Sequence, residues 1–205
     1  PKEYLYTMPY STIAKYDVGK RPSTVWPGKE QSPAIKPLAT ELIDSVENYV
    51  KANGLDPMRY NIEIKCRKGK DEGKNWPEYH EFVDKCMELL LSKNLGDRLV
   101  VQCFDARALN YMHEKYPQVK LSYLISKKDT DWDTYMGKLN FTPDWLSPEF
   151  VIVDQTMVDN CRKAGIRLVP WTVDNEADIR RILDFHVEAI ITNYPDRVLK
   201  ITRGY

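Results

Sequence analysis

The sequence has no excess of charge of either sign. Its 205 residues include 30 basic and 30 acidic side chains, so the formal net charge is zero. Without a field of one sign, the chain is a poor candidate for binding nucleic acid or an anionic membrane surface. It also lacks an apolar run of the roughly 18 residues that a membrane-spanning helix needs. Because 42% of the residues are hydrophobic, we expect a globular core and no membrane span.

Cysteine and histidine are both scarce. The cysteines are widely separated, with no CxxC pair and no histidine at zinc-ligand spacing. Each lies in or beside an apolar helix or strand pattern, which favours buried thiols over a disulfide or metal site for Cys66, Cys86, Cys103 and Cys161. The histidines fall in helix patterns or ahead of a strand, so we expect structural or solvated roles for His80, His113 and His186.

Several common catalytic motifs are absent. The chain has no GxSxG, P-loop, GxGxxG or HExxH string, which removes the simplest nucleophile, nucleotide and zinc chemistries. It opens with Pro-Lys-Glu, without an initiator Met or a signal-like apolar run, so we expect it to begin inside a longer gene product or after processing. Residues 1–36 are rich in Pro, Tyr and Lys and indicate a loop or excursion between elements.

From residue 37 onward, helical and extended patterns alternate. The first helix is expected over about 37–53, opened by Pro37 and closed by Gly54, with one apolar stripe formed by Leu38, Leu42, Ile43, Val46, Tyr49 and Val50. Later helices are expected from about 77, over 132–139, from about 195, and after the N-cap residues Asp105, Asp154 and Asp174, with Gly165 ending one of them. Strands are expected over 60–65, 99–104, 121–125, 145–147, 166–173 and 189–192.

This alternation is the pattern of parallel βαβ units in one α/β domain. A (β/α)8 barrel needs eight strands and typically about 250 residues, whereas the pattern supplies six strands. Two arrangements therefore stay open at this point: an open, doubly wound sheet, or a TIM barrel whose first two strands are not in the chain.

The strand expected over 61–65 carries polar side chains, which are unusual on a strand of a parallel sheet that is covered on both faces. Period two places Ile62 and Ile64 on one face, toward the helices, and Asn61, Glu63 and Lys65 on the other. The carboxyl ends of strands are where barrel enzymes build their sites, so Glu63 is a candidate ligand for a divalent cation and Lys65 a candidate phosphate contact. The alternative is a polar face on a half-exposed strand.

Two aromatic residues end later strands. Phe104 and Trp171 would form a wall that contacts the carbon skeleton of a small substrate, although ordinary core packing explains either one singly. The segment 192–195 leads into a helix N-terminus, which makes it either an anion position or, as we expect, a plain turn.

Five short motifs occur in register along the chain. They are NIEIK at 61–65, VVQCFD at 100–105, LSP at 146–148, VPWTVDN at 169–175 and ITNYPD at 191–196. Together with YDVGKRP at 16–22 and the segment 36–50, this series resembles the glycerophosphodiester phosphodiesterase family over about two thirds of the chain.

The resemblance implies a (β/α)8 barrel that hydrolyses glycerophosphodiesters to glycerol phosphate and an alcohol with a divalent cation, Ca²⁺ or Mg²⁺. It implies that Glu63 is a metal ligand, that Lys65 is a catalytic residue contacting the phosphate, and that Phe104 and Trp171 line the glycerol side. It also implies a small-molecule diester as the partner and a periplasmic or cell-envelope location.

The His-Arg, Glu-x-Asp and His-Asp strings of that family do not occur before Asn61. We expect them upstream of Pro1, so the chain alone is expected to be inactive, and a barrel without two strands is expected to be marginally stable or to self-associate. Two alternatives stay open: a non-catalytic barrel that binds a phosphorylated ligand, and a metal-dependent barrel that cleaves phosphoinositides or sphingolipids.

Overall fold

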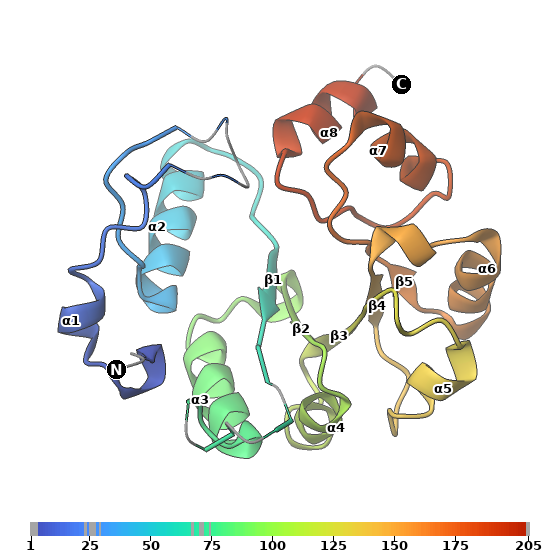
Figure 1. Cartoon of the computed structure of the whole chain (residues 1–205), viewed down its shortest axis with the longest axis horizontal. Helices are drawn as coiled ribbons and strands as arrows, with labels where there is room; N and C mark the ends of the chain where they lie inside the picture. Colours follow the sequence, from blue (N-terminus) through green and yellow to red (C-terminus); the bar gives the residue numbers. More distant parts are fainter. Residues whose placement is uncertain are drawn as a thin grey trace. The chain divides into compact units, whose positions relative to one another are not determined.

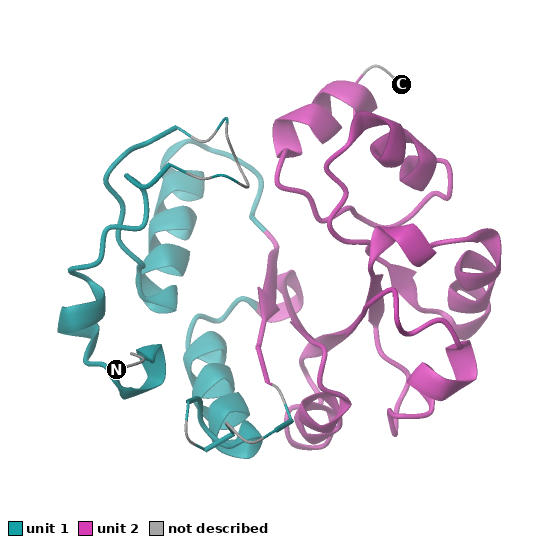
Figure 2. Ribbon diagram, in the orientation of Figure 1, with its two compact units in different colours: residues 1–58, 68–95 teal, residues 59–67, 96–205 magenta. Residues whose placement is uncertain are grey.

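The computed structural model describes residues 4–22, 24, 28, 30–66, 68–69, 72–73 and 75–203. The chain forms two compact units, coloured separately in Figure 2. The first unit consists of Pro1–Met58 with Lys68–Leu95, and the second of Arg59–Arg67 with Gly96–Tyr205. Within the described residues, no helix is long and apolar enough to cross a membrane.

The first unit is helical. It contains η1 (Leu5–Thr7), α1 (Tyr10–Ile13), α2 (Ala39–Ala52) and α3 (Tyr79–Leu91). The first two are single turns within a segment that the sequence assigned to a loop. Helix α3 begins where the Glu78 carboxylate accepts a hydrogen bond from the backbone N–H of His80, which satisfies one of the unpaired donors of the first turn.

Helix α2 confirms the first helix expected from the sequence, but only part of its apolar stripe is buried. Ile43 and Val50 are buried, whereas Leu42 and Tyr49 are exposed. An apolar stripe is buried only where another element packs against its full width. In the described part of the chain, α2 is therefore packed along only one edge of the apolar stripe.

The second unit contains a five-stranded parallel sheet. Figure 1 shows its strands, which neighbour one another in chain order: β1 (Tyr60–Glu63), β2 (Leu99–Cys103), β3 (Lys120–Ile125), β4 (Trp145–Pro148) and β5 (Arg167–Leu168). A doubly wound sheet reverses its strand order at a switch point, whereas a barrel adds each strand beside the last. The sequential order therefore favours the barrel over the doubly wound sheet.

Helices follow the strands of this unit: α4 (Ala106–Lys115), α5 (Trp132–Met136), α6 (Gln155–Ala164), α7 (Glu176–Leu183) and α8 (Pro195–Thr202), with the short turns η2 (Gly96–Arg98) and η3 (Phe150–Ile152). Two expected N-caps are confirmed, because Asp105 accepts from Arg107 N at 3.0 Å and Asp154 accepts from Met157 N at 2.8 Å. Gly165 ends α6 at φ 72°, a left-handed conformation that glycine adopts without strain.

Asp174 is not the N-cap of α7, contrary to the sequence expectation. The cap is Asn175, whose side-chain oxygen accepts a hydrogen bond from Ala177 N at 3.0 Å. The carboxylate of Asp174 instead bonds the side chains of Thr192 and Asn193, as described below. Both residue types cap helices well, so a tertiary partner decides which of the two does so.

The fifth and sixth expected strands are shorter than the sequence indicated. Strand β5 covers Arg167–Leu168 rather than 166–173, and 189–192 is not a regular strand. Val169 N donates to Leu146 O and Trp171 N donates to Pro148 O, both at 2.9 Å, but Pro148 lacks the N–H that would return a bond to Val169 O, so the ladder is incomplete at that point. The 188–191 segment still runs beside β5, because Glu188 N donates to Leu168 O and Ile191 N to Pro170 O.

The two faces of the sheet differ in polarity. The register pairs Ile62 with Val101 and Val101 with Leu121, which gives one apolar face. It also pairs Glu63 with Gln102 and Gln102 with Ser122, so a row of polar side chains lies on the opposite face. Ser122 and Ser147, both fully buried on this polar face, satisfy each other through a hydroxyl–hydroxyl bond of 2.8 Å.

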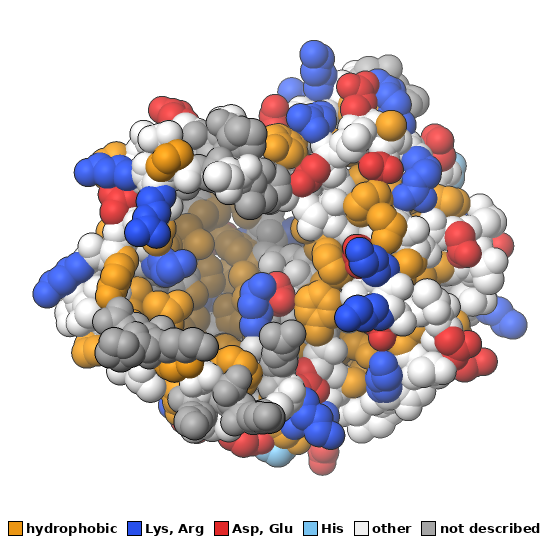
Figure 3. Space-filling model, viewed as in Figure 1, with side chains coloured by type: hydrophobic (Ala, Val, Ile, Leu, Met, Phe, Trp, Pro, Cys, Tyr) orange, Lys and Arg blue, Asp and Glu red, His pale blue; other side chains and the backbone are white. Residues whose placement is uncertain are grey.

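Charge on the surface is mixed, as the zero net charge requires. In Figure 3, basic and acidic side chains are interspersed over the visible face of the second unit. No disulfide joins the cysteines, of which Cys66, Cys103 and Cys161 are buried and Cys86 is half-buried. Burial raises the pKa of the Cys86 thiol to about 11 and that of Cys161 to about 12, so both are protonated packing residues.

Candidate active site

Glu63 and Lys65 form an ion pair at the carboxyl end of β1. Lys65 Nζ lies 3.3 Å from Glu63 Oε2, and the two side chains are 79% and 25% exposed, respectively. Between them Ile64 is buried, so the period-two alternation expected from the sequence is present in the structure. The ammonium group is therefore accessible to a ligand, while the carboxylate beside it is largely covered.

Gln102 supports this pair from the neighbouring strand. Its side-chain oxygen accepts a hydrogen bond of 3.0 Å from Asn61 Nδ2, and its backbone oxygen accepts one of 2.9 Å from Ile64 N. The backbone bond carries the β1–β2 pairing one residue past Glu63, and the side-chain bond joins the same two strands ahead of it. Sequence patterns predict no role for Gln102, although period two within 99–104 places it on one face with Phe104.

Phe104 and Trp171 contact each other. Their rings meet edge to face, with centroids 5.5 Å apart and an interplanar angle of 86°. The indole N–H of Trp171 donates to Ser147 O at 2.8 Å, which fixes the ring against β4. Phe104 is 44% exposed, so the pair presents an apolar surface to solvent rather than closing a core.

Glu149 is a second carboxylate at this edge of the sheet. It directly follows β4, pairs with Trp171 through an isolated parallel bridge, and accepts a hydrogen bond of 2.8 Å from Lys127 N. The sequence contains a signal for it, an acidic residue immediately after the LSP motif, which the strand assignment passed over. Because parallel strands end at the same edge, all of these groups lie at the carboxyl-end edge of the sheet.

A complete divalent-cation site is not formed by these residues. Within the residues that the structure describes, no three or more His, Cys, Asp or Glu side chains are grouped closely enough to hold a metal ion. Calcium takes about 6–8 oxygen ligands, whereas Glu63 offers one carboxylate, already paired with Lys65. Asp105, the nearest carboxylate along β2, is bound by Arg107 at 2.7 Å. We therefore derive no catalytic step through a metal ion.

The 192–195 segment is a turn held by Asp174. The Asp174 carboxylate accepts hydrogen bonds from Thr192 Oγ1 at 3.0 Å, from Asn193 N at 2.8 Å and from Asn193 Nδ2 at 2.9 Å. Arg197 lies over the Tyr194 ring at 4.3 Å and donates to the backbone oxygen of Asp174. The expected plain turn is therefore confirmed, with its donors directed at a carboxylate of the chain itself.

Asp174 makes the stability of the second unit depend on pH. Burial raises the pKa of the Asp174 carboxyl, but hydrogen bonds from Asn193 and Thr192 outweigh burial, so the pKa lies below its usual value. A carboxyl with a lowered folded-state pKa stabilises above its unfolded pKa, and the contribution is lost as pH falls through the folded value.

We expect Asp174→Asn to lower the free energy of unfolding at pH 7 by about 1–3 kcal/mol, because one oxygen acceptor becomes an N–H donor facing Asn193. Urea unfolding at several pH values measures this difference, which is expected to shrink as pH falls below about 4, where the unfolded carboxyl takes up a proton, and to be lost below the lower folded-state pKa. The exposed Asp184, replaced by Asn, serves as the control and should show no such trend. A difference for Asp174→Asn that is constant across the pH range would contradict this assignment.

The histidines lie outside this group, as expected. His80 pairs with Glu78 at 2.9 Å, and His113 stacks on Phe141 with ring centroids 4.1 Å apart. His186 follows α7 in a left-handed conformation, ahead of the 188–191 segment. None of the three follows the carboxyl end of a strand, the position at which a histidine would face a substrate held by Lys65.

Comparison with known proteins identifies relatives of the chain. A family model described as "Glycerophosphoryl diester phosphodiesterase family" matches residues 2–197. Glycerophosphodiester phosphodiesterase of Bacillus subtilis is 30% identical over 120 residues, which are 58% of this chain and 41% of that protein. The Caldanaerobacter subterraneus enzyme of the same name is 24% identical over 126 residues, 61% of this chain and 51% of its own. The chain thus spans about half the length of these curated relatives.

Solved structures resemble the chain over nearly its whole length. A structure described as a glycerophosphoryl diester phosphodiesterase from Silicibacter pomeroyi has a TM-score of 0.78 at 24% identity, covering 96% of this chain and 69% of that one. An Oleispira antarctica phosphodiesterase, solved in complex with the product sn-glycerol-3-phosphate, has a TM-score of 0.73 at 21% identity, covering 97% and 72%. These likenesses show the fold and confirm the predicted TIM-type (β/α)8 class.

Proposed function

The chain belongs to the glycerophosphoryl diester phosphodiesterase family, and from that membership we propose that its second unit carries part of an active site that hydrolyses glycerophosphodiesters to glycerol phosphate and an alcohol. The observation that carries this proposal is the placement of an ion pair and an aromatic pair at one edge of a parallel sheet. A cationic group can bind the phosphate of glycerol phosphate, and an adjoining apolar surface can contact its carbon atoms.

In this proposal, different side chains bind the phosphate and the glycerol of the substrate. When a ligand is present, the exposed Lys65 ammonium breaks its ion pair with Glu63 and binds phosphate oxygens instead. The ammonium group offers three hydrogen-bond donors for these oxygens. The Phe104 and Trp171 rings contact the carbon atoms of the glycerol, which lie against an apolar surface more favourably than in water. Glu63 keeps Lys65 oriented in the absence of a ligand.

The proposed cofactor is a divalent cation, Ca²⁺ or Mg²⁺, as the family resemblance implies. Glu63 is its candidate ligand in this chain, since it is the acidic side chain that ends β1 on the polar face. The other oxygen ligands would have to come from water, from the substrate phosphate or from groups other than the described residues. When bound, such a cation would neutralise charge on the phosphate.

Hydrolysis also needs a general acid and a general base, and none of the three histidines lies at this edge of the sheet. We therefore expect the 205-residue chain to release little or no glycerol phosphate from glycerophosphocholine. The protein expressed from the complete gene is expected to release it with Ca²⁺ or Mg²⁺. Both proteins would be assayed side by side for released glycerol phosphate. Inactivity of the complete product with every divalent ion and every glycerophosphodiester tried would defeat the proposal.

A second function is favoured by one observation: among the described residues, the carboxylates at this edge, Glu63 and Glu149, do not belong to a group of three or more side chains that could hold a metal ion. On this alternative, the protein binds a phosphorylated ligand through Lys65 and the aromatic pair without cleaving it. Calorimetry with glycerol phosphate, run on the complete gene product, separates the two functions, since binding without turnover supports the second and turnover supports the first.

A further inference from the structure

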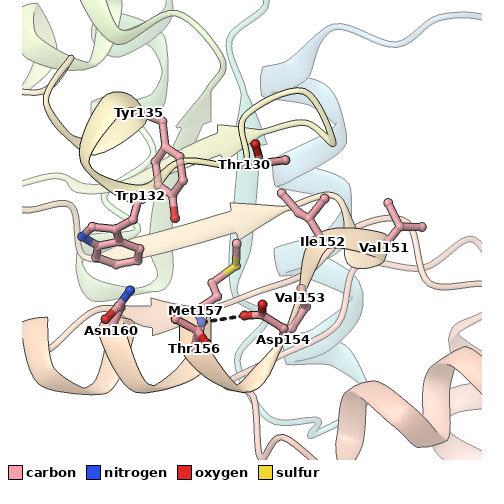
Figure 4. Close-up of a pocket in the computed structure, with 10 residues that line it drawn as sticks. All are labelled: Thr130, Trp132, Tyr135, Val151, Ile152, Val153, Asp154, Thr156, Met157 and Asn160. Carbon is pink, nitrogen blue, oxygen red and sulfur yellow. Dashed lines mark hydrogen bonds between the residues drawn. The ribbon is translucent and has the colours of Figure 1, made fainter.

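A separate pocket lies where the amino-terminal ends of α5 and α6 meet η3 in the second unit. Its volume is about 320 Å³, and none of its lining residues belongs to the group at the carboxyl ends of the strands described above. Figure 4 shows Trp132 and Tyr135 on one side of the space, Met157 at its floor and Asp154 on the other side. The volume lies within the range of small-molecule sites, which begins at about 300 Å³.

The Tyr135 hydroxyl is directed into this pocket and has no protein partner. The side chain is 1% exposed, and in the described part of the chain its hydroxyl forms no hydrogen bond. Figure 4 shows the hydroxyl pointing into the space between Trp132 and Met157. Among the described residues, this oxygen is not one of the buried atoms that lack a partner, so it is open to the pocket, where a ligand hydroxyl can take the place of water.

The surroundings of this hydroxyl are acidic. Burial is the main cause that raises the pKa of Tyr135, and neighbouring acidic groups, among them Asp154, Asp131 and Asp129, raise it further. Among the described residues that line the pocket, none is Lys or Arg. Asp129 has Lys138 as an ion-pair partner at 3.5 Å, whereas Asp154 and Asp131 form no ion pair with described residues. The pocket therefore disfavours phosphate and other anions and favours a cation.

The arrangement of aromatic rings and carboxylate fits an organic cation in particular. One Asp154 oxygen accepts the hydrogen bond from Met157 N that caps α6, which leaves the other oxygen available. The Trp132 and Tyr135 rings lie at 67° with centroids 5.6 Å apart, so they form a corner rather than a stack. A tryptophan face is the strongest aromatic partner for an ammonium group.

We propose that this pocket binds a small organic ammonium ion that also carries a hydroxyl, with its cationic head between Trp132 and Asp154 and its hydroxyl bonded to Tyr135. The thioether and methylenes of Met157 contact the alkyl groups of the ligand. This site does not depend on the proposed phosphodiesterase activity, because its ligand carries no phosphate and does not need Lys65.

Choline is the probe, and its uncharged carbon isostere, dimethylbutanol, is the control ligand. Titration of the 205-residue chain with choline, followed by calorimetry and by protein chemical shifts, is expected to show saturable binding in the millimolar range. The isostere is expected to bind about tenfold more weakly, a difference of about 1.4 kcal/mol, because it has the same shape without the charge. No saturable choline binding, or equal binding of the two compounds, would overturn the proposal.

Three variants locate the binding. Asp154→Asn removes the charge but keeps a residue that caps α6 as well as Asp does, and we expect about tenfold weaker choline binding. Tyr135→Phe breaks no protein hydrogen bond and is expected to weaken choline binding several-fold, and Trp132→Leu is expected to abolish it. The matched control, Asp159→Asn, removes a carboxylate of the same helix outside the pocket and should leave affinity unchanged. Choline affinity unaltered by Asp154→Asn and Trp132→Leu would place binding elsewhere and refute this site.

Discussion

Replacing Lys65 with methionine is expected to lower kcat/KM for glycerophosphocholine by about a hundredfold or more in the protein expressed from the complete gene. Methionine keeps the length of the side chain but removes the charge and the three donors proposed to hold the phosphate. Because Lys65 is 79% exposed, the change should leave folding intact, which circular dichroism and thermal melting would check. Steady-state kinetics with a glycerol phosphate assay measures the effect.

The matched control is Lys163→Met, which removes an exposed lysine from α6. We expect its kcat/KM to equal that of the wild type, since a remote surface charge contributes little at physiological ionic strength. If Lys65→Met and Lys163→Met retain equal activity, Lys65 does not contact the phosphate. If both lose activity equally, the loss reflects net charge rather than a contact.

Replacing Leu146 with alanine is expected to destabilise the chain by about 2–5 kcal/mol. Leu146 is fully buried in β4, where it pairs with Tyr123 on one side and Leu168 on the other. The substitution removes an isopropyl group, so its buried apolar area is lost and a cavity is left that the neighbouring strands cannot close. Since domains are stable by only about 5–15 kcal/mol, the midpoint of urea unfolding should fall markedly.

The exposed Leu199 of α8 provides the control for this experiment. Leu199→Ala makes the same chemical change at a surface position and is expected to shift stability by less than about 1 kcal/mol. Equal losses for the two variants would show that β4 is not part of the core of the second unit. A loss for Leu146→Ala alone would agree with the sheet described above.

Local chemistry explains which elements could be predicted from the sequence. Asp105 and Asp154 cap helices through bonds to residues two or three positions away, so the sequence contains the whole interaction. Asp174 sits beside an equally good cap, and its real partners are Thr192 and Asn193, which only the fold brings near. The strand expected over 166–173 is shorter in the structure because Pro148, on the neighbouring strand, lacks an N–H that the ladder needs, and the local apolar pattern does not reveal that partner.

In the candidate site, too, contacts within one strand could be predicted from the sequence, whereas contacts between strands could not. Period two within one strand was enough to place Glu63 and Lys65 on a polar face, as the structure shows. The contact between Phe104 and Trp171 depends on the register of separate strands, which the sequence does not encode locally. Gln102 and Glu149 each have a local signal in the sequence, but their partners, Asn61 and Trp171, lie on neighbouring strands that only the fold brings near. The functional roles assigned to Glu63, Lys65, Phe104 and Trp171 stay predictions.

A crystal structure of the protein grown with sn-glycerol 3-phosphate tests the central claim most directly. We predict a phosphate oxygen within hydrogen-bonding distance of Lys65 Nζ and the glycerol carbons against the rings of Phe104 and Trp171. A ligand bound with its phosphate away from Lys65, or with its glycerol out of contact with both rings, would contradict the account.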